Sequence, residues 1–208
     1  MKSIFKRAAF ATALLFILTL VSWPMSVKAD SAPAKVTVAT YHTDMLNALK
    51  SDDAKSAIGR FNLFAPIMDV AFDFQTMIKT VAGQHWRKAD TADQEALRDA
   101  FRRVSIATYA NRFKDLSSDA AFIIQAVKDG PRRMKLVEST LEAGKEPVAL
   151  TYVVRNTENG WRIIDVLLDG GISELALRAS EYARMLETGG AAALHATLNA
   201  QADGLLRP

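Results

Sequence analysis

The sequence predicts an α+β fold in which helices come first, a four-stranded antiparallel sheet follows, and helices return at the end. Three observations predict this order. Apolar residues recur at helical spacing from Val36 to Lys114 and again after Ser173. Between these stretches the spacing changes to the alternation that is typical of strands. Residues that favour tight turns separate the alternating stretches, so the strands are expected to pair as hairpins.

The first helix is expected to begin near Val36, after a short polar and Pro-containing lead at 30–35. Residues 58–81 are apolar at helical spacing, but Pro66 interrupts them, so two or three short helices are expected there. Gly83 is placed to end the last of these helices.

Thr91 and Gln94 predict a capping box, in which Thr91 is the N-cap and Gln94 reaches back to it. The helix that begins there carries a wide apolar stripe and is expected to end near Lys114. We expect it to be the longest helix of the protein.

Four strands are predicted at 121–127, 132–141, 148–155 and 161–167. Their short connections contain Gly130, Gly144 and Gly160, which indicates antiparallel hairpins because parallel strands need long crossovers. Ile163 and Ile164 make the fourth strand apolar on both faces, so a central position in the sheet is expected.

A tight turn is expected at 169–171, directly after the fourth strand. Ser173 is then a candidate N-cap for a helix that Gly189-Gly190 would end. A last helix is expected from Ala191 to Leu206.

The N-terminus has the order of a secretory signal peptide, and cleavage is expected after Ala29. Three basic residues are followed by an apolar run from Ala8 to Val21. An uncleaved membrane anchor is the alternative, but the run is shorter than the ~20 residues that cross a bilayer. The sequence therefore predicts export, with residues 30–208 forming one domain in the periplasm.

The net positive charge of the chain comes from this export signal. The chain has 26 Lys and Arg residues against 23 Asp and Glu, a formal charge of +3. Four of the basic residues and none of the acidic ones lie in 1–29, so 22 basic residues remain against 23 acidic ones. The basic isoelectric point therefore gives no support to nucleic-acid binding. Because the chain has no cysteine, its stability must come from its core.

Residues that could carry catalysis are few. The three histidines, His42, His85 and His195, lie in separate elements and lack metal-ligand spacing, so no metal or other cofactor is expected. Asp165 and Asp169 are four residues apart along a strand, roughly 13 Å, which is too far to share a proton. No catalytic residue is assigned.

Large, flexible apolar side chains are instead abundant in the helical half. Most are expected to pack in the core, but such a stripe facing a curved sheet can also leave an adaptable cavity. The members are Phe61, Phe64, Met68, Phe72, Phe74, Met77, Trp86, Phe101 and Phe113.

Taken together, the motifs of both halves resemble those of the MlaC family, also called the toluene-tolerance family of periplasmic lipid carriers. The most specific segment is Trp161-Arg162-Ile163-Ile164-Asp165-Val166, followed by Asp169-Gly170 and Ile172-Ser173. The helical half adds Gly83-Gln84-His85-Trp86 and Thr108-Tyr109. Residues 172–182, with one extra residue at the strand exit, are closer to the hopanoid-associated branch (HpnM) than to the phospholipid-carrying branch.

The resemblance implies a curved, NTF2-like or cystatin-like sheet wrapped by helices, with a lipid pocket between them. It implies a carrier without enzymatic activity that takes an apolar lipid, a hopanoid or a phospholipid, between an inner-membrane transport complex and an outer-membrane acceptor. Contact with the membrane surface would be transient. Carried over to this sequence, the pocket residues are Phe64, Met68, Phe72, Met77, Phe101, Val104, Tyr109, Leu150 and Tyr152.

Two alternatives remain open from the residues themselves. An enzyme on the same fold would need His85 or Asp165 to point inward beside a second titratable group. An interaction module would have a filled core without a cavity. Arg102, Arg103 and Arg112 are candidates for contact with a lipid headgroup or a partner complex, against the alternative of a solvated helix face.

Overall fold

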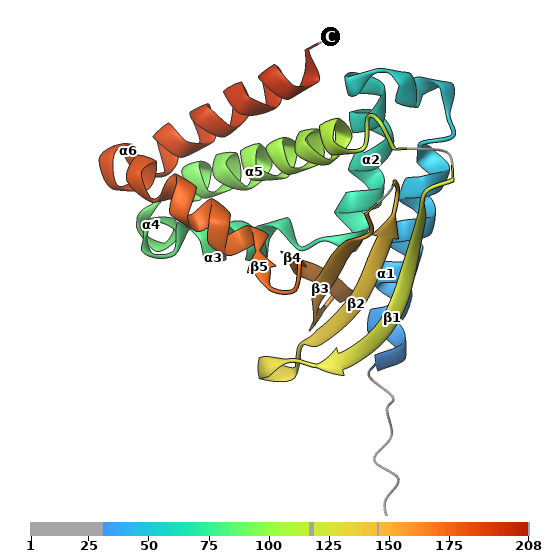
Figure 1. The fold of residues 1–208 in the computed structure, drawn as a ribbon. Coiled ribbons are helices and arrows are strands. Elements are labelled where there is room, and N and C mark those ends of the chain that lie inside the picture. Colours follow the sequence, from blue (N-terminus) through green and yellow to red (C-terminus); the bar gives the residue numbers. More distant parts are fainter. Residues whose placement is uncertain (1–30, 117–118, 145, 208) are drawn as a thin grey trace, which may run out of the picture.

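Helices, then strands, then a helix follow one another in the computed structural model, which describes residues 31–116, 119–144 and 146–207 (Figure 1). The predicted signal peptide lies outside the described residues. The helices before the sheet are α1 (Ser31–Ala48), α2 (Ala57–Ala71), α3 (Phe74–Ala82), α4 (Gln84–Lys88) and α5 (Thr91–Arg112). The strands are β1 (Ala121–Asp129), β2 (Lys135–Glu142), β3 (Val148–Thr157), β4 (Gly160–Leu168) and β5 (Ile172–Ser173), and α6 (Glu174–Leu206) follows them.

The first helix is longer than predicted. The polar stretch at 30–35 was expected to be a non-helical lead, yet α1 already begins at Ser31. Pro33 lies in the first turn, where a missing N–H leaves no helical hydrogen bond unmade. Composition therefore gave the wrong start for this helix.

Pro66 does not break its helix either. It lies inside α2, and the chain leaves the helical conformation only at Phe72. The break is set by Asp73, whose side chain accepts from Thr76 N at 2.8 Å and so begins α3. Phe64 and Met68 on either side of Pro66 are fully buried, so core packing outweighs the hydrogen bond that Pro66 cannot donate.

Helix α5 begins one residue away from the predicted cap. Asp90 is the N-cap and accepts from Asp93 N at 2.8 Å, while Thr91 is the first helical residue. The side chain of Gln94 donates to the carbonyls of Trp86 and Ala89, which ties α5 to α4. Gly83 ends α3 with a φ of 53°, as predicted.

The strands form one antiparallel sheet in the order β1-β2-β3-β4-β5. The prediction of four strands joined by hairpins is confirmed, and the short β5 is the strand that was missed. The second strand begins at Lys135 rather than at Arg132, because residues 131–133 form a helical turn.

The fourth strand is not central in the sheet. Ile163 pairs with Val154 and Asp165 with Val153, so Ile164 is the extra residue of a β-bulge, and both isoleucines are buried. Beyond β4 lie only the two residues of β5 and a bridge to Phe72 at the end of α2. The isoleucine pair therefore marks a bulge and a covered edge.

Helix α6 is bent back on itself. Ser173 caps it by accepting from Ala176 N at 2.9 Å, as predicted, and Gly190 interrupts it with φ 63° and ψ −157°. The second segment (red) then returns along α5 to the C-terminus, while α1 (blue) covers one face of the sheet (Figure 1). Because α6 is broken at Gly190, α5 is the longest unbroken helix among the described residues.

One hydrophobic core joins the helices to the sheet. Helix α1 contributes Tyr41 to it, α5 contributes Phe101, and β3 contributes Tyr152. Among the described helices, none combines the length and the hydropathy needed to span a membrane.

Candidate functional site

A cavity of about 480 Å³ lies between α5, the two segments of α6 and the end of the sheet. The fold-back at Gly190 creates it, because residues of both α6 segments line it together with α5. Its apolar lining consists of Val104 from α5, Leu168 and Ile172 from β4 and β5, and Leu177 and Leu205 from α6.

Large apolar side chains are exposed at this cavity. Ile172 is 60% exposed and Leu177 is 53% exposed, although both are large hydrophobic residues. Scattered exposed apolar residues are normal on protein surfaces, but two that line the same cavity form an apolar rim. Such a rim suits the passage of an apolar ligand.

An ion pair between helix ends lies in the cavity wall. Arg112 in the last turn of α5 donates to the carboxylate of Glu174 in the first turn of α6. Both charges lie where the helix dipoles favour them, the cation at a C-terminus and the anion at an N-terminus. The Glu174 side chain is only 10% exposed, whereas that of Arg112 is 46% exposed. The pair thus joins α5 to α6.

Arg178 is the second cation in the cavity wall. Its guanidinium donates to the hydroxyl of Tyr182 at 3.0 Å and lies 5.6 Å from the centre of the Phe101 ring. Both of these partners are uncharged.

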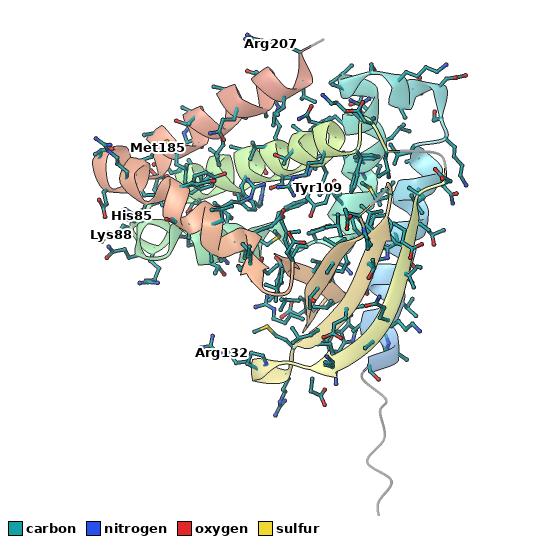
Figure 2. The ribbon with its side chains drawn as sticks, in the orientation of Figure 1. His85, Lys88, Tyr109, Arg132, Met185 and Arg207 are labelled. Carbon is teal, nitrogen blue, oxygen red and sulfur yellow. The ribbon has the colours of Figure 1, made fainter. Side chains whose placement is uncertain are left out.

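Tyr109 lies in the core between these cations and the sheet. Figure 2 labels it on α5, and its ring lies 6.1 Å from that of Phe72. Burial raises the pKa of Tyr109 above its ordinary value, Glu174 raises it further, and Arg112 and Arg178 oppose the rise. Tyr109 is therefore neutral, and the guanidinium of Arg112 lies 5.7 Å from the centre of its ring.

Only one of the residues predicted to line a lipid pocket, Val104, lines this cavity. Phe101 and Tyr109 lie behind it, under the guanidinium groups of Arg178 and Arg112. The core holds Phe64, Met68, Phe72, Met77 and Tyr152, and Leu150 packs against it partly buried. Whether these eight residues contact a ligand stays a prediction.

Sequence reasoning missed the contribution of α6. Leu177, Arg178 and Leu205 are brought to the cavity only because α6 folds back. The signal was present in the Gly189-Gly190 pair, which predicted a helix break but not the direction of the chain after it.

Other hollows also lie on the described part of the chain. One of about 740 Å³ is mostly polar and contains Asp73, Thr76 and Arg155, which are hydrogen-bonded to one another. Another of about 410 Å³ lies between α1 and α2, beside the exposed Val36 and Val70. A third hollow of about 720 Å³ lies beside α5 and contains Arg102 and Arg103. The cavity at α5 and α6 differs from all three in holding a buried carboxylate, that of Glu174.

Neither of the residues named for an enzymatic dyad lines the cavity. Asp165 accepts from Val166 N, Leu175 N and the Ser173 hydroxyl, so it holds the start of α6. His85 lies on the short helix α4, at the outer edge of the helices in Figure 2. Among the described residues, no group of acidic or histidine side chains is arranged to hold a metal ion.

The two remaining arginine candidates are held in ion pairs. Arg102 makes a two-pronged contact with Asp69 at 2.5 and 2.6 Å. Arg103 pairs with Asp203 at 2.6 Å and donates to the carbonyl of Asn199 at 3.1 Å, which ties α5 to the second segment of α6. Of the three arginines considered from the sequence, only Arg112 lines the cavity.

Comparison with known proteins decides the family. The family model described as MlaC protein matches residues 39–200, which is more than half of the chain. The chain belongs to the MlaC family. No curated protein matches the sequence.

The fold of this MlaC-family protein is shared with a solved structure. It is similar to the phospholipid-binding protein from Ralstonia solanacearum, solved in complex with a phospholipid. The two are 23% identical, the match covers 84% of this chain and 99% of that one, and the TM-score is 0.74. The likeness establishes the shared α+β fold.

Proposed function

We propose that this MlaC-family protein is a periplasmic carrier that binds one apolar lipid and has no enzymatic activity. The observation that carries the proposal is the cavity of about 480 Å³ with an apolar lining and an apolar rim. Its volume is in the range of small-molecule sites in proteins. Membership of the MlaC family and the phospholipid held by the Ralstonia protein of the same fold support it.

The physical need for such a carrier follows from the cost of exposing acyl chains to water. Each CH2 group that leaves an apolar environment costs about 0.8 kcal/mol, so a chain of roughly 16 carbons meets a barrier of about 13 kcal/mol. A protein that covers the chain in a dry cavity lowers this barrier without any nucleophile or metal. Extraction, diffusion and release are then sufficient.

The setting of this carrier is also part of the proposal. Residues 1–29 act as a cleaved signal peptide, and residues 30–208 form a single lipid-binding domain. The domain exchanges lipid with an inner-membrane transport complex and an outer-membrane acceptor, with transient contact to the membrane surface.

Two lipid classes are candidates for the ligand. The extra residue in Asp169-Gly170-Gly171-Ile172-Ser173 favours the hopanoid-associated branch, and Ile172 of this segment is at the cavity rim. The ligand of the Ralstonia protein favours a phospholipid. The same segment therefore distinguishes the two branches of the family and contributes Ile172 to the rim of the cavity.

The test is to export the full chain in a Gram-negative host, purify the mature protein and identify extracted lipids by mass spectrometry. Near-stoichiometric lipid is expected. Leu177→Asp places a charge at the rim and should strongly reduce the lipid recovered. Ile58→Asp is the matched control, because Ile58 is 50% exposed on α2 and does not line the cavity.

Protein that is recovered without lipid, and that takes up none from vesicles, would contradict the carrier and favour an interaction module. Equal loss of lipid from both variants would show that the cavity at α5 and α6 is not the binding site.

A further inference from the structure

Arg178 is a cation in the cavity wall that no acidic side chain of the described residues neutralises. It forms no ion pair with any residue in the described part of the chain. Its side chain is partly buried and lines the cavity together with Leu177 and Leu205. An anionic acceptor would stabilise a partly buried guanidinium in such surroundings.

The contacts that Arg178 does make position it without satisfying its charge. The hydrogen bond to the Tyr182 hydroxyl uses one of the five N–H donors of the guanidinium. The guanidinium also lies over the Phe101 ring, a contact that uses none of its N–H donors. These contacts hold the group in place and leave donors free for a further acceptor.

The neighbouring arginines show the contrast. Arg102, Arg103 and Arg112 each pair with a carboxylate of this chain. Arg112 and Arg178 line the same cavity, but the one buried carboxylate there, Glu174, is already bound to Arg112. The exposed Glu181, although it lines the cavity too, makes no ion pair with Arg178. The described residues therefore leave donors of Arg178 open to an acidic group of a ligand.

We infer that Arg178 binds an acidic group of the ligand, either the phosphate of a phospholipid or the carboxylate of a fatty acid. Guanidinium groups bind both with charge-assisted, often paired hydrogen bonds. The inference rests on the proposed function and deepens it, because it selects acidic lipids over neutral ones of equal apolar size.

The test compares probes that share their acyl chains and differ in charge. The mature protein, freed of co-purified lipid, is titrated by calorimetry with dihexanoyl phosphatidylglycerol and with dihexanoylglycerol. Decanoate and decanol form a second pair. Comparison of the two pairs shows whether the acidic group that Arg178 binds is a phosphate or a carboxylate. Each acidic probe that reaches Arg178 is expected to bind at least about tenfold more tightly than its neutral counterpart, the usual effect of a hydrogen bond to a charged group.

Variants then assign the preference to one side chain. Arg178→Gln should lose the preference and keep the affinity for the neutral probe, which also shows that the variant is folded. Arg178→Lys should keep part of the preference because the charge remains. Arg184→Gln is the matched control and should behave as the wild type, since Arg184 is exposed on the same helix and does not line the cavity.

Equal affinity of the wild type for both members of both probe pairs would overturn the inference and leave the carrier intact. An acidic preference that survives in Arg178→Gln would overturn it as well. If no probe of either kind binds, the proposed function fails together with the inference.

Discussion

Replacing Gly190 by alanine tests whether the fold-back of α6 depends on a conformation that only glycine adopts easily. Gly190 has φ 63° and ψ −157°, a region of the backbone map that residues with a Cβ scarcely populate. A Cβ added there would meet no atom within 4 Å, so the whole cost arises from the backbone and not from a clash. We expect the variant to lose about 1–3 kcal/mol of unfolding free energy.

The chain has one other way to respond, which is to straighten α6 into a continuous helix. Straightening would remove the second segment from α5 and expose Leu194 and Leu198, which are fully buried. Exposing each would cost about 1.5–3 kcal/mol, so together they exceed the strain. The bent form should therefore persist, with unchanged helical content and radius of gyration.

The assay is urea unfolding followed by circular dichroism, with small-angle scattering of the native state. Gly204→Ala is the matched control, because Gly204 lies in the same segment, has no left-handed φ and has open space around its Cα. It should be stabilised by up to about 1 kcal/mol. A Gly190→Ala protein as stable as the wild type, or one that is more extended, would refute the reasoning.

Two further predictions concern buried charge. His42 stacks on Phe122 with the ring centres 4.1 Å apart, and burial lowers the pKa of His42 to about 4. Because this pKa lies below that of the unfolded state, the contribution of His42 to stability is fully present above pH 6.5. It is lost progressively as the pH falls towards 4. His42→Phe should retain the stacking and reduce the loss of unfolding free energy between pH 7 and pH 4 by up to about 3 kcal/mol, measured by urea unfolding at both values; an unchanged pH dependence would contradict this. Glu174→Gln should lower the free energy of unfolding at pH 7 by about 1–2 kcal/mol, measured by thermal melting. The loss is smaller than for a fully buried ion pair because Arg112 can still reach water. Glu181→Gln is the control and should show no such loss.

Local features of the fold were predictable because local chemistry sets them. Gly83 ends α3 because glycine adopts a positive φ easily, and Ser173 begins α6 because its side chain caps the helix. The strands were predicted from the alternation of apolar residues and from the turn residues between them. The error at Pro66 has the opposite cause. A proline costs about 3 kcal/mol in a helix interior, but the burial of Phe64 and Met68 offsets it, and packing of this kind is not visible in a local pattern.

The candidate site was less predictable than the fold. Val104 was carried over through the family resemblance, and it lies on the buried face of α5. Leu177 and Arg178 lie on a helix surface that, taken alone, indicates solvent exposure. Their place in the cavity depends on the second segment of α6 returning over them, which is set by tertiary packing against α5.

The segment that carries the family resemblance also forms one wall of the cavity. Asp165 binds Leu175 N and the Ser173 hydroxyl, so the end of β4 fixes the first turn of α6. That turn holds Glu174 against Arg112, and one turn further Arg178 lines the cavity without a counter-ion. Asp165 thus shapes the cavity by fixing the start of α6. Its substitution should disturb the order of the α6 N-terminus.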